Sequence, residues 1–261
     1  MLNINVHTPV LINEICEFIP KTKKINIIDA TFGGGGYSRI FLKNYNINQL
    51  IAIDRDPITN DFAKDLNKRY KNFKLVNGCF SKLDELISVH SKNIKNKFDI
   101  IIFDLGLSSN QLENPKRGFS FSRNGPLDMN MGSNNILASD VVNSFSEKEL
   151  TDIFFKLGEE RYSKRIAKKI IESRKIKLIN STIQLSELIK LSIPKITNNK
   201  KKIDPATKVF QALRIYVNDE LNELKKALSK TIKLLNNEGK LIVVSFQSLE
   251  DRIVKDFFNH N

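Results

Sequence analysis

Cysteine and histidine are scarce in this chain of 261 residues, which contains two cysteines and three histidines. Cys16 and Cys79 lack the spacing of a zinc or iron–sulfur site, and His7, His90 and His260 are too scattered to form a metal site. Each cysteine also lies in an apolar stretch, as reduced thiols in a protein core do. The composition therefore predicts a protein without a metal site or a disulfide framework.

Long apolar runs are absent as well. No segment approaches the roughly 20 residues that a helix needs to cross a bilayer, and residues 1–10 lack the apolar region of a secretion signal. We therefore expect a cytoplasmic protein with no membrane partner, either a monomer or a homodimer. A hydrophobic content of 41% suffices for one large domain or for one domain with an inserted lobe.

The most informative segment is a run of four glycines, Gly33 to Gly36, directly after an apolar stretch at residues 25–30. A second apolar stretch ends in Asp54, eighteen residues after the last glycine. A strand, a glycine loop, a helix and a second strand ending in an acid form the adenosine site of doubly wound α/β domains. Glycines admit a ligand close to the backbone, and the carboxylate accepts hydrogen bonds from the ribose hydroxyls.

What this loop lacks narrows the choice of cofactor. The dinucleotide fingerprint requires a glycine at its sixth position, where this chain has Ser38 or Arg39, depending on the register. No Walker lysine follows the glycines, which disfavours a P-loop nucleotide site. S-adenosylmethionine fits best, because it has a ribose but no phosphate for a helix N-terminus to bind. A plain glycine turn and the site of a nucleotide-dependent oxidoreductase are the competing interpretations.

Five short apolar segments have the composition of strands buried on both faces of a parallel sheet. They lie at residues 25–29, 49–53, 73–77, 99–103 and 240–246. Residues capable of chemistry stand where these segments end: Asp29, Asp54, Asn77 with Phe80, Asp104 and Ser245. Ligands of open α/β sheets bind outside the carboxyl ends of the strands. We therefore predict an α/β fold with a doubly wound, mostly parallel sheet and one site at this edge.

More than 130 residues separate the fourth segment from the fifth, too many for one crossover helix. We predict an inserted, mostly helical lobe at residues 110–204, and a cofactor-binding domain made of residues 1–109 and 205–261. Residues 105–135 are rich in Gly, Ser, Asn and Pro and predict an extended loop. The spacing of Ser146 and Glu149 predicts a capped helix start, and residues 205–235 have one long helical pattern.

Positive charge is concentrated in the expected lobe. The chain has a net charge of +13, and residues 156–204 alone contain fourteen Lys or Arg against five Asp or Glu. In residues 161–175, one helical stripe is apolar and another is basic, with Arg161, Lys164, Arg165 and Lys168. Such a face predicts contact with a polyanion, most plausibly nucleic acid. A solvated lysine face, or lysine enrichment from an AT-rich genome, is the alternative.

Nine motifs, in order along the chain, resemble the ribosomal RNA small subunit methyltransferase H family, also called MraW. They are HTPVL (7–11), DATFGGGGYS (29–38), AIDRDP (52–57), DLGLSSNQL (104–112), RGFSF (117–121), GPLDMNM (125–131), GEERYSKRIA (158–167), FQALRIYVNDEL (210–221) and SFQSLEDRIV (245–254). The resemblance implies a class I, Rossmann-like methyltransferase fold. It also implies methyl transfer from S-adenosylmethionine to the exocyclic amine (N4) of a cytidine in the decoding region of bacterial 16S rRNA, with the small ribosomal subunit as partner.

The resemblance also implies roles for individual residues. Gly35, Gly36 and Tyr37 would contact the methionine part of the cofactor, Asp54 the ribose and Phe80 the adenine, while Asp104 and Gln111 would complete the site. For Phe80, packing in the core is the alternative. Lys208, in the motif DPATK, joins the basic residues expected to bind RNA.

Three positions depart from the family. Tyr37, Asp204 and Gln247 stand where the family usually has histidine, and the chain lacks the family's basic C-terminal tail. If a lost histidine were an obligatory base, the protein would be an RNA-binding or assembly protein without catalytic activity.

For the reaction, we expect Asp104 to accept a hydrogen bond from the target amine, assisted by Ser108 and Ser109. A flipped-out base would stack on Phe119 or Phe121.

Overall fold

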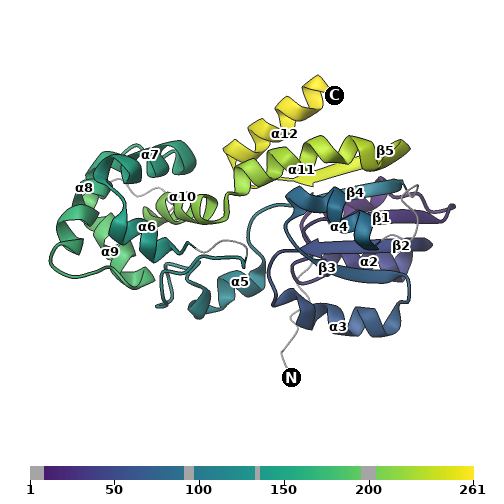
Figure 1. Ribbon diagram of the computed structural model, residues 1–261, viewed down its shortest axis with the longest axis horizontal. Helices are drawn as coiled ribbons and strands as arrows, with labels where there is room; N and C mark the ends of the chain where they lie inside the picture. Colours follow the sequence, from purple (N-terminus) through teal and green to yellow (C-terminus); the bar gives the residue numbers. More distant parts are fainter. Residues whose placement is uncertain (1–8, 91–96, 133–135, 195–203) are drawn as a thin grey trace. The chain divides into compact units, whose positions relative to one another are not determined.

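The structure is a computed structural model that describes residues 9–90, 97–132, 136–194 and 204–261. The chain forms two compact units (Figure 1). Unit 1 consists of Met1–Ser109 and Leu221–Asn261, and unit 2 consists of Asn110–Glu220. The first two residues of the HTPVL motif, His7 and Thr8, lie outside the described residues.

Unit 1 contains a sheet of five parallel strands in the order β3-β2-β1-β4-β5. The strands are β1 (Ile25–Asp29), β2 (Ile47–Asp54), β3 (Phe73–Asn77), β4 (Phe98–Asp104) and β5 (Leu235–Val244). Along β4, all residues from Phe98 to Phe103 are buried, as expected of a central parallel strand covered on both faces. The predicted α/β fold with a doubly wound parallel sheet is confirmed.

Helices cover both faces of this sheet, because neighbouring residues of a strand point to opposite sides. On one face, Ile25, Ile27 and Ile100 pack with α1 (Ile12–Glu17), α2 (Gly36–Asn44) and α3 (Thr59–Arg69). On the other face, Ile28 and Ile101 pack with α4 (Leu83–His90), α11 (Glu220–Leu234) and α12 (Ser248–His260). A short 3-10 helix, η1 (Phe80–Lys82), leads from β3 into α4.

The last strand, β5, is irregular and begins earlier than the sequence predicts. Leu235 pairs with Phe98 and Lys240 with Ile100, so residues 236–239 bulge out of the ladder. Glu238 in this bulge has a φ of 65°, and Asn236 binds Asp99 through its side chain at 3.1 Å. The strand expected at residues 240–246 is therefore the second part of one interrupted strand that begins at Leu235.

Unit 2 is mostly helical, as predicted. After α5 (Ser109–Glu113) and η2 (Pro115–Arg117) it contains α6 (Ala138–Ser144), α7 (Glu147–Gly158), α8 (Ser163–Arg174), α9 (Thr182–Ser192) and α10 (Ala206–Asn218). The predicted capping box at Ser146 and Glu149 is present at the start of α7. Helix α7 packs on α10 at Gly158, where a Cβ would lie 2.5 Å from the backbone oxygen of Lys208. Close helix contact therefore requires glycine at this position.

The second boundary between the units differs from the expected one. The sequence assigned residues 205–261 to the first domain, whereas α10 belongs to unit 2 and the chain returns to unit 1 at Leu221. The single helix expected at 205–235 is divided by Asp219, which has a left-handed φ of 50°. The buried side chain of Asn218 binds the backbone of Met129 and Met131, at 2.8 and 2.9 Å, and so holds the end of α10 inside unit 2.

The glycine-rich segment after β4 is more compact than an extended loop. Within residues 110–132, a Cβ at Gly118 would lie 2.2 Å from the oxygen of Pro126, and a Cβ at Gly125 would lie 1.8 Å from the oxygen of Pro115. The hydroxyl of Thr182, at the start of α9, donates to the oxygen of Arg123 at 2.7 Å. This part of the segment therefore folds back on itself within unit 2, and residues 133–135 lie outside the described residues.

Over the described ranges, no helix combines the length and the apolar character that crossing a bilayer requires.

Candidate functional site

Polar side chains stand at the carboxyl ends of four neighbouring strands in unit 1. Asp54 ends β2 opposite Asn77 of β3, and Asp104 ends β4 opposite Val244 of β5. Asp29 ends β1, which lies between β2 and β4. Because all five strands are parallel, these residues share one edge of the sheet, the edge where ligands of this fold class bind.

Asp54 fastens the glycine loop to this edge. Its Oδ2 accepts a hydrogen bond of 2.7 Å from the amide of Gly33, and its Oδ1 accepts one of 2.8 Å from the amide of Asp56. Gly33 and Gly35 have φ values of 52° and 77°, which glycine adopts without strain. A Cβ at Gly35 would also lie 2.7 Å from the ring of Phe32. The loop therefore depends both on its glycines and on the carboxylate.

Asp29 is buried beneath the loop. Its Oδ2 accepts a hydrogen bond of 2.6 Å from the hydroxyl of Ser38 in α2, whereas its buried Oδ1 has no partner among the described residues. Burial raises the pKa of Asp29 to about 6, and the hydrogen bond from Ser38 opposes this rise. Burial likewise raises the pKa of Asp54 to about 6.

Asp104 is the most perturbed carboxyl of this edge. Burial raises its pKa to about 7, and the negative charges of Asp29 and Glu250 contribute to the rise. The hydroxyl of Thr31 accepts a 2.6 Å hydrogen bond from the amide of Asp104 and so fixes the backbone there. The Oδ1 atom of Asp104 is buried without a hydrogen-bond partner in the described part of the chain. It can therefore accept a hydrogen bond or a proton from a ligand.

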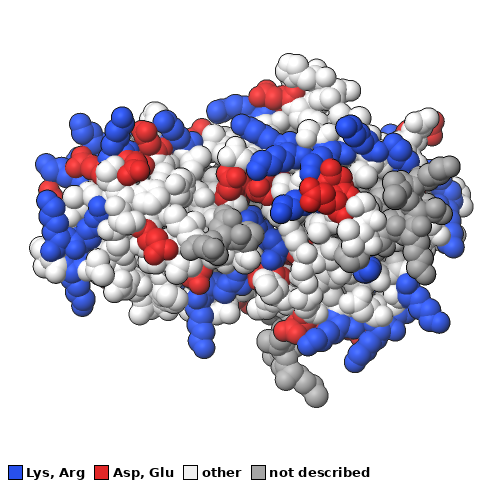
Figure 2. Space-filling model, in the orientation of Figure 1, with Lys and Arg blue, Asp and Glu red and all other residues white. Residues whose placement is uncertain are grey.

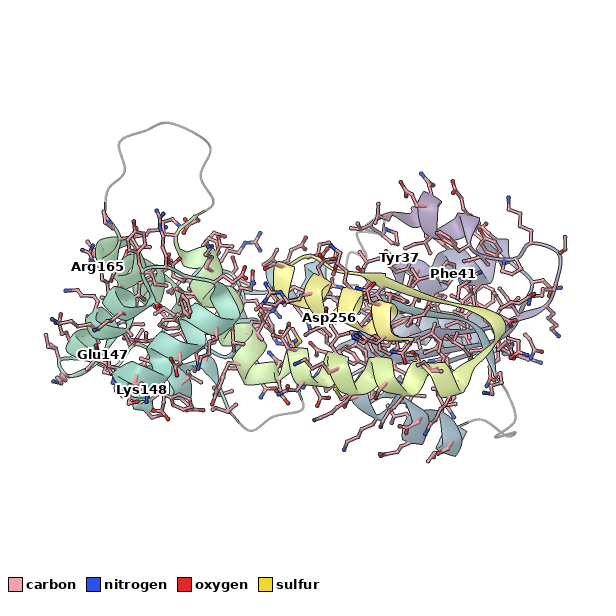
Figure 3. All side chains as sticks on the ribbon, turned by 90° about the horizontal axis from the view of Figure 1, so that it is seen from above. Tyr37, Phe41, Glu147, Lys148, Arg165 and Asp256 are labelled. Carbon is pink, nitrogen blue, oxygen red and sulfur yellow. The ribbon has the colours of Figure 1, made fainter. Side chains whose placement is uncertain are left out.

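Tyr37 lies on α2 beside Phe41 and is buried (Figure 3). Its hydroxyl donates to the backbone oxygen of Val10, which ties the segment before α1 to the first turn of α2. Burial raises the pKa of Tyr37, and the charges of Asp104 and Asp29 raise it further. The phenol therefore stays protonated at neutral pH and cannot act as a general base.

Phe80 follows β3 at the far side of the sheet edge. Its ring packs edge-to-face on Phe103, with the centroids 5.7 Å apart, and it is only partly buried. The flanking residues are anchored, because Glu223 of α11 accepts hydrogen bonds from the thiol of Cys79 and the hydroxyl of Ser81. Phe80 thus makes the core contact that the alternative interpretation predicted. Its ring is also partly exposed, and the turn that carries it is anchored.

The remaining expected site residues lie in the segment after β4. Ser108 and Ser109 are half-buried at the end of the first part of unit 1. A Cβ at Gly33 would lie 3.5 Å from Cβ of Ser108, so Ser108 borders the glycine loop. Gln111 is buried in α5 and belongs to unit 2.

The edge as a whole suits an elongated ligand with positive charge. It offers glycines at the loop, carboxylates at three strand ends and a partly open ring after β3. A nearby cation would stabilise the charged forms of Asp29 and Asp104. Each of them has one buried oxygen without a hydrogen-bond partner among the residues described. No group of three His, Cys, Asp or Glu residues in the described ranges is placed to bind a metal ion.

The basic residues of α8 and its first turn project from unit 2. Arg161, Lys164, Arg165 and Lys168 are exposed, whereas Ile166 and Ile170 are buried, as the two predicted stripes require. Figure 2 shows the blue side chains over this helix, and Arg165 is labelled in Figure 3. The guanidinium of Arg161 lies 4.7 Å from the centre of the Tyr162 ring. The four lysines at 195 and 200–202, which add to the charge of this region, lie outside the described residues.

Lys208 has a structural contact that the sequence did not suggest. Its ammonium group donates a hydrogen bond of 2.9 Å to the backbone oxygen of Glu159, at the C-terminus of α7. A cation is favourable there because a helix C-terminus carries partial negative charge. The side chain is nevertheless exposed.

Comparison with known proteins shows the family of this chain. The model of the MraW methylase family matches residues 4–261. The chain belongs to the MraW methylase family. Two relatives, both called ribosomal RNA small subunit methyltransferase H, are 46% identical in Rickettsia massiliae (strain Mtu5) and 44% identical in Rickettsia bellii (strain RML369-C). The matches cover 99% and 98% of this chain and 81% of each relative. A crystal structure of a putative sarcosine dimethylglycine methyltransferase from Galdieria sulphuraria aligns with a TM-score of 0.29 at 12% identity.

In this member of the family, the two other positions at which the resemblance implies histidine make local contacts. Asp204 accepts a hydrogen bond of 2.8 Å from the amide of Ala206 at the start of α10, and it pairs with Lys190 at 3.1 Å. Gln247 precedes α12 and donates a hydrogen bond of 2.8 Å to Glu250. Both residues therefore stabilise helix starts.

Two residues of this candidate site were missed in the sequence. Thr31 fixes the backbone of Asp104, and Glu250 adds negative charge near its carboxyl group. Glu250 is the third residue of α12, where a carboxylate can bind an amide that precedes the helix. Its position could therefore have indicated its hydrogen bond from the amide of Phe246. Thr31 gave no sequence signal.

The expected stacking residues are placed differently from the expectation. Phe119 is buried, with the guanidinium of Arg117 over its ring at 5.7 Å. Phe121 packs edge-to-face on Phe210 at 5.3 Å. Both rings are thus used in packing within unit 2.

Proposed function

We propose that this protein transfers a methyl group from S-adenosylmethionine to the exocyclic amine (N4) of a cytidine in the decoding region of bacterial 16S rRNA. The observation that carries the proposal is the Asp104 carboxylate at the end of β4, with a raised pKa and a buried oxygen that has no hydrogen-bond partner among the described residues. The relatives named as small-subunit rRNA methyltransferases support the RNA substrate.

The cofactor would lie along the carboxyl edge of the sheet. Gly35, Gly36 and Tyr37 would border its methionine part, Asp54 would accept hydrogen bonds from the ribose hydroxyls, and Phe80 would contact the adenine. Each oxygen of Asp54 accepts one backbone hydrogen bond and retains a second lone pair. Asp104 and Gln111 are the two further residues that we propose as contacts of the cofactor. When bound, S-adenosylmethionine supplies a methyl group made electrophilic by its sulfonium.

The exocyclic nitrogen of cytosine is a poor nucleophile, because its lone pair is delocalised into the ring. A carboxylate that accepts a hydrogen bond from this amine makes the lone pair more available and stabilises the positive charge that develops on nitrogen. Asp104 would also take the proton that the nitrogen must lose after it is methylated. A pKa near neutral pH suits a group that accepts and then releases a proton. Ser108 and Ser109 would assist by orienting the amine.

RNA would be held by the basic residues of unit 2. Arg161 just before α8, and Lys164, Arg165 and Lys168 on α8, are exposed and would contact phosphate groups. Lys208 would have to exchange its contact with Glu159 for a phosphate, so we expect it to contribute least to RNA binding.

The test is methyl transfer with tritiated S-adenosylmethionine on small ribosomal subunits that lack the modification, followed by nucleoside analysis. Label on N4 of a cytidine supports the proposal, and Asp104→Asn should lower the single-turnover rate at least about 100-fold at saturating cofactor. Asp61→Asn, at an exposed carboxylate on α3, is the matched control. Full activity in Asp104→Asn would refute the role of the carboxylate. If the wild-type protein transfers no label but still binds the subunit, an RNA-binding or assembly function is correct instead.

A further inference from the structure

Phe246 is an exposed aromatic residue at the carboxyl edge of the sheet. It follows β5 by two residues, and 58% of its surface is exposed. The other aromatic residues that closely follow a strand in the described part of unit 1 are Phe32, which is buried, and Phe80, which packs on Phe103. A large apolar ring with this exposure at a site edge is free to contact a ligand.

The ring of Phe246 lies beside the segment that follows Asp104. A Cβ built on Gly106 would lie 3.5 Å from Cδ2 of Phe246, an ordinary van der Waals contact. The amide of Leu105 donates a hydrogen bond of 3.0 Å to Val244, which joins the two strand ends. Phe246 is therefore held next to the residues that directly follow Asp104.

Glu250 links the same turn to Asp104. Its Oε2 accepts a hydrogen bond of 3.1 Å from the amide of Phe246, and its Oε1 accepts one of 2.8 Å from the side chain of Gln247. The charge of Glu250 also contributes to the raised pKa of Asp104, after burial and the charge of Asp29. The buried carboxylate of Glu250 thus fixes the backbone that presents the ring of Phe246.

The strand order gives the edge a direction. Phe80 follows β3 at one end of the sheet, and Asp54 and Asp29 end the next two strands. At the other end, Asp104 ends β4 and Phe246 follows β5. An adenosyl cofactor with its adenine near Phe80 and its ribose at Asp54 would extend towards Asp104. The β4–β5 end is then the part of the edge left for the group that receives the methyl.

We propose that Phe246 is the platform on which the target cytosine stacks while its amine meets Asp104, and that Glu250 positions this platform. The inference rests on the proposed function and adds the base-binding residue to it. An aromatic ring suits this purpose because a nucleobase taken out of its stack loses its neighbours, and a planar side chain replaces one of them.

The experiment compares Phe246→Ala, Phe246→Leu and Phe246→Tyr in single-turnover methyl transfer to small subunits at saturating cofactor. We expect Phe246→Ala to slow transfer about 10- to 100-fold, Phe246→Leu to be intermediate and Phe246→Tyr to stay close to the wild-type rate. The affinity for S-adenosylmethionine, measured by calorimetry, should be unchanged in all three. The affinity for the subunit should change little, because phosphate contacts dominate it.

The matched control is Phe258→Ala, which removes another exposed ring, 49% accessible, from the opposite end of α12. Glu250→Gln keeps the shape of the positioning residue, and Glu250→Ala removes it, so the second should reduce the rate more than the first. If Phe246→Ala transfers methyl groups at the wild-type rate, the inference about Phe246 is wrong, but the proposed function stands. Absence of transfer by the wild-type protein overturns the proposed function and the inference with it.

Discussion

The amide of Gly33 donates a hydrogen bond of 2.7 Å to the carboxylate of Asp54, which joins the glycine loop to the end of the second strand. The same carboxylate is the one that a cofactor ribose would contact. Asp54 therefore serves the ligand site and the loop that shapes it, and replacing it should affect binding and stability together.

Replacing Asp54 with Asn tests this double role. One of the two amides, of Gly33 or of Asp56, would then face an NH₂ group instead of an acceptor. We expect a loss of about 1–3 kcal/mol in the free energy of unfolding and at least about a 10-fold weaker affinity for S-adenosylmethionine. Urea denaturation and calorimetry measure the two effects. Asp61→Asn should change neither, and unchanged cofactor affinity in Asp54→Asn would show that the ribose is bound elsewhere.

The stability of the ligand-free protein should fall as the pH rises from about 5 to about 7. Asp29, Asp54 and Asp104 have folded-state pKa values of about 6, 6 and 7, above the ordinary value of 3.8. In this range the folded state holds more protons than the unfolded state, so raising the pH favours unfolding. Each group can contribute at most about 1.4 kcal/mol per pH unit.

Denaturation at pH 5, 6 and 7 measures this dependence. Asp104→Asn removes one of the titrating groups, so the free energy of unfolding should depend less on pH between pH 6 and 7. A stability that rises over this interval would contradict the assignment of raised pKa values to these carboxyls.

Tyr37→Phe removes only the hydroxyl that binds Val10. The loss of one hydrogen bond should cost about 0.5–1.5 kcal/mol and increase amide exchange in the segment before α1. Because the phenol stays protonated, methyl transfer at saturating cofactor should remain within about 3-fold of wild type. A larger loss of rate without a loss of stability would mean that the hydroxyl takes part in the reaction.

The basic residues of α8 can be tested with the triple variant Lys164→Gln, Arg165→Gln and Lys168→Gln. We expect the affinity for the small subunit to fall about 10-fold or more at 0.1 M salt, with a shallower dependence on salt concentration. Replacing three exposed lysines of unit 1, Lys68, Lys71 and Lys225, with Gln removes the same charge elsewhere. Equal effects of the two triple variants would show that net charge, and not the face of α8, determines binding.

Much of unit 1 could be predicted from the sequence, because buried parallel strands leave an apolar signal. The segments 25–29 and 73–77 match β1 and β3 in full, and Asp54 and Asp104 stand at the strand ends as expected. The capping box of α7 was predicted for a similar reason, since Ser146 and Glu149 are close in sequence and interact locally.

Long-range contacts explain most of what could not be predicted. The helix expected at 205–235 ends at Asn218 because its side chain binds residues 129 and 131, a contact with no local signal. Thr31 and Glu250 act on Asp104 from segments far apart in the chain. Phe121 could not be distinguished from an exposed ring, since its packing on Phe210, 89 residues later in the chain, depends on the fold of unit 2.

The irregular strand β5 has a consequence for the behaviour of the protein in concentrated solution. It pairs only with β4 among the described strands, so its outer edge is open to edge-to-edge aggregation with other chains. The bulge at residues 236–239 interrupts this edge, and the exposed charges of Glu238 and Lys240 oppose the approach of another strand. Residues 236–240, which have no role in the proposed reaction, would thus prevent strand pairing between molecules.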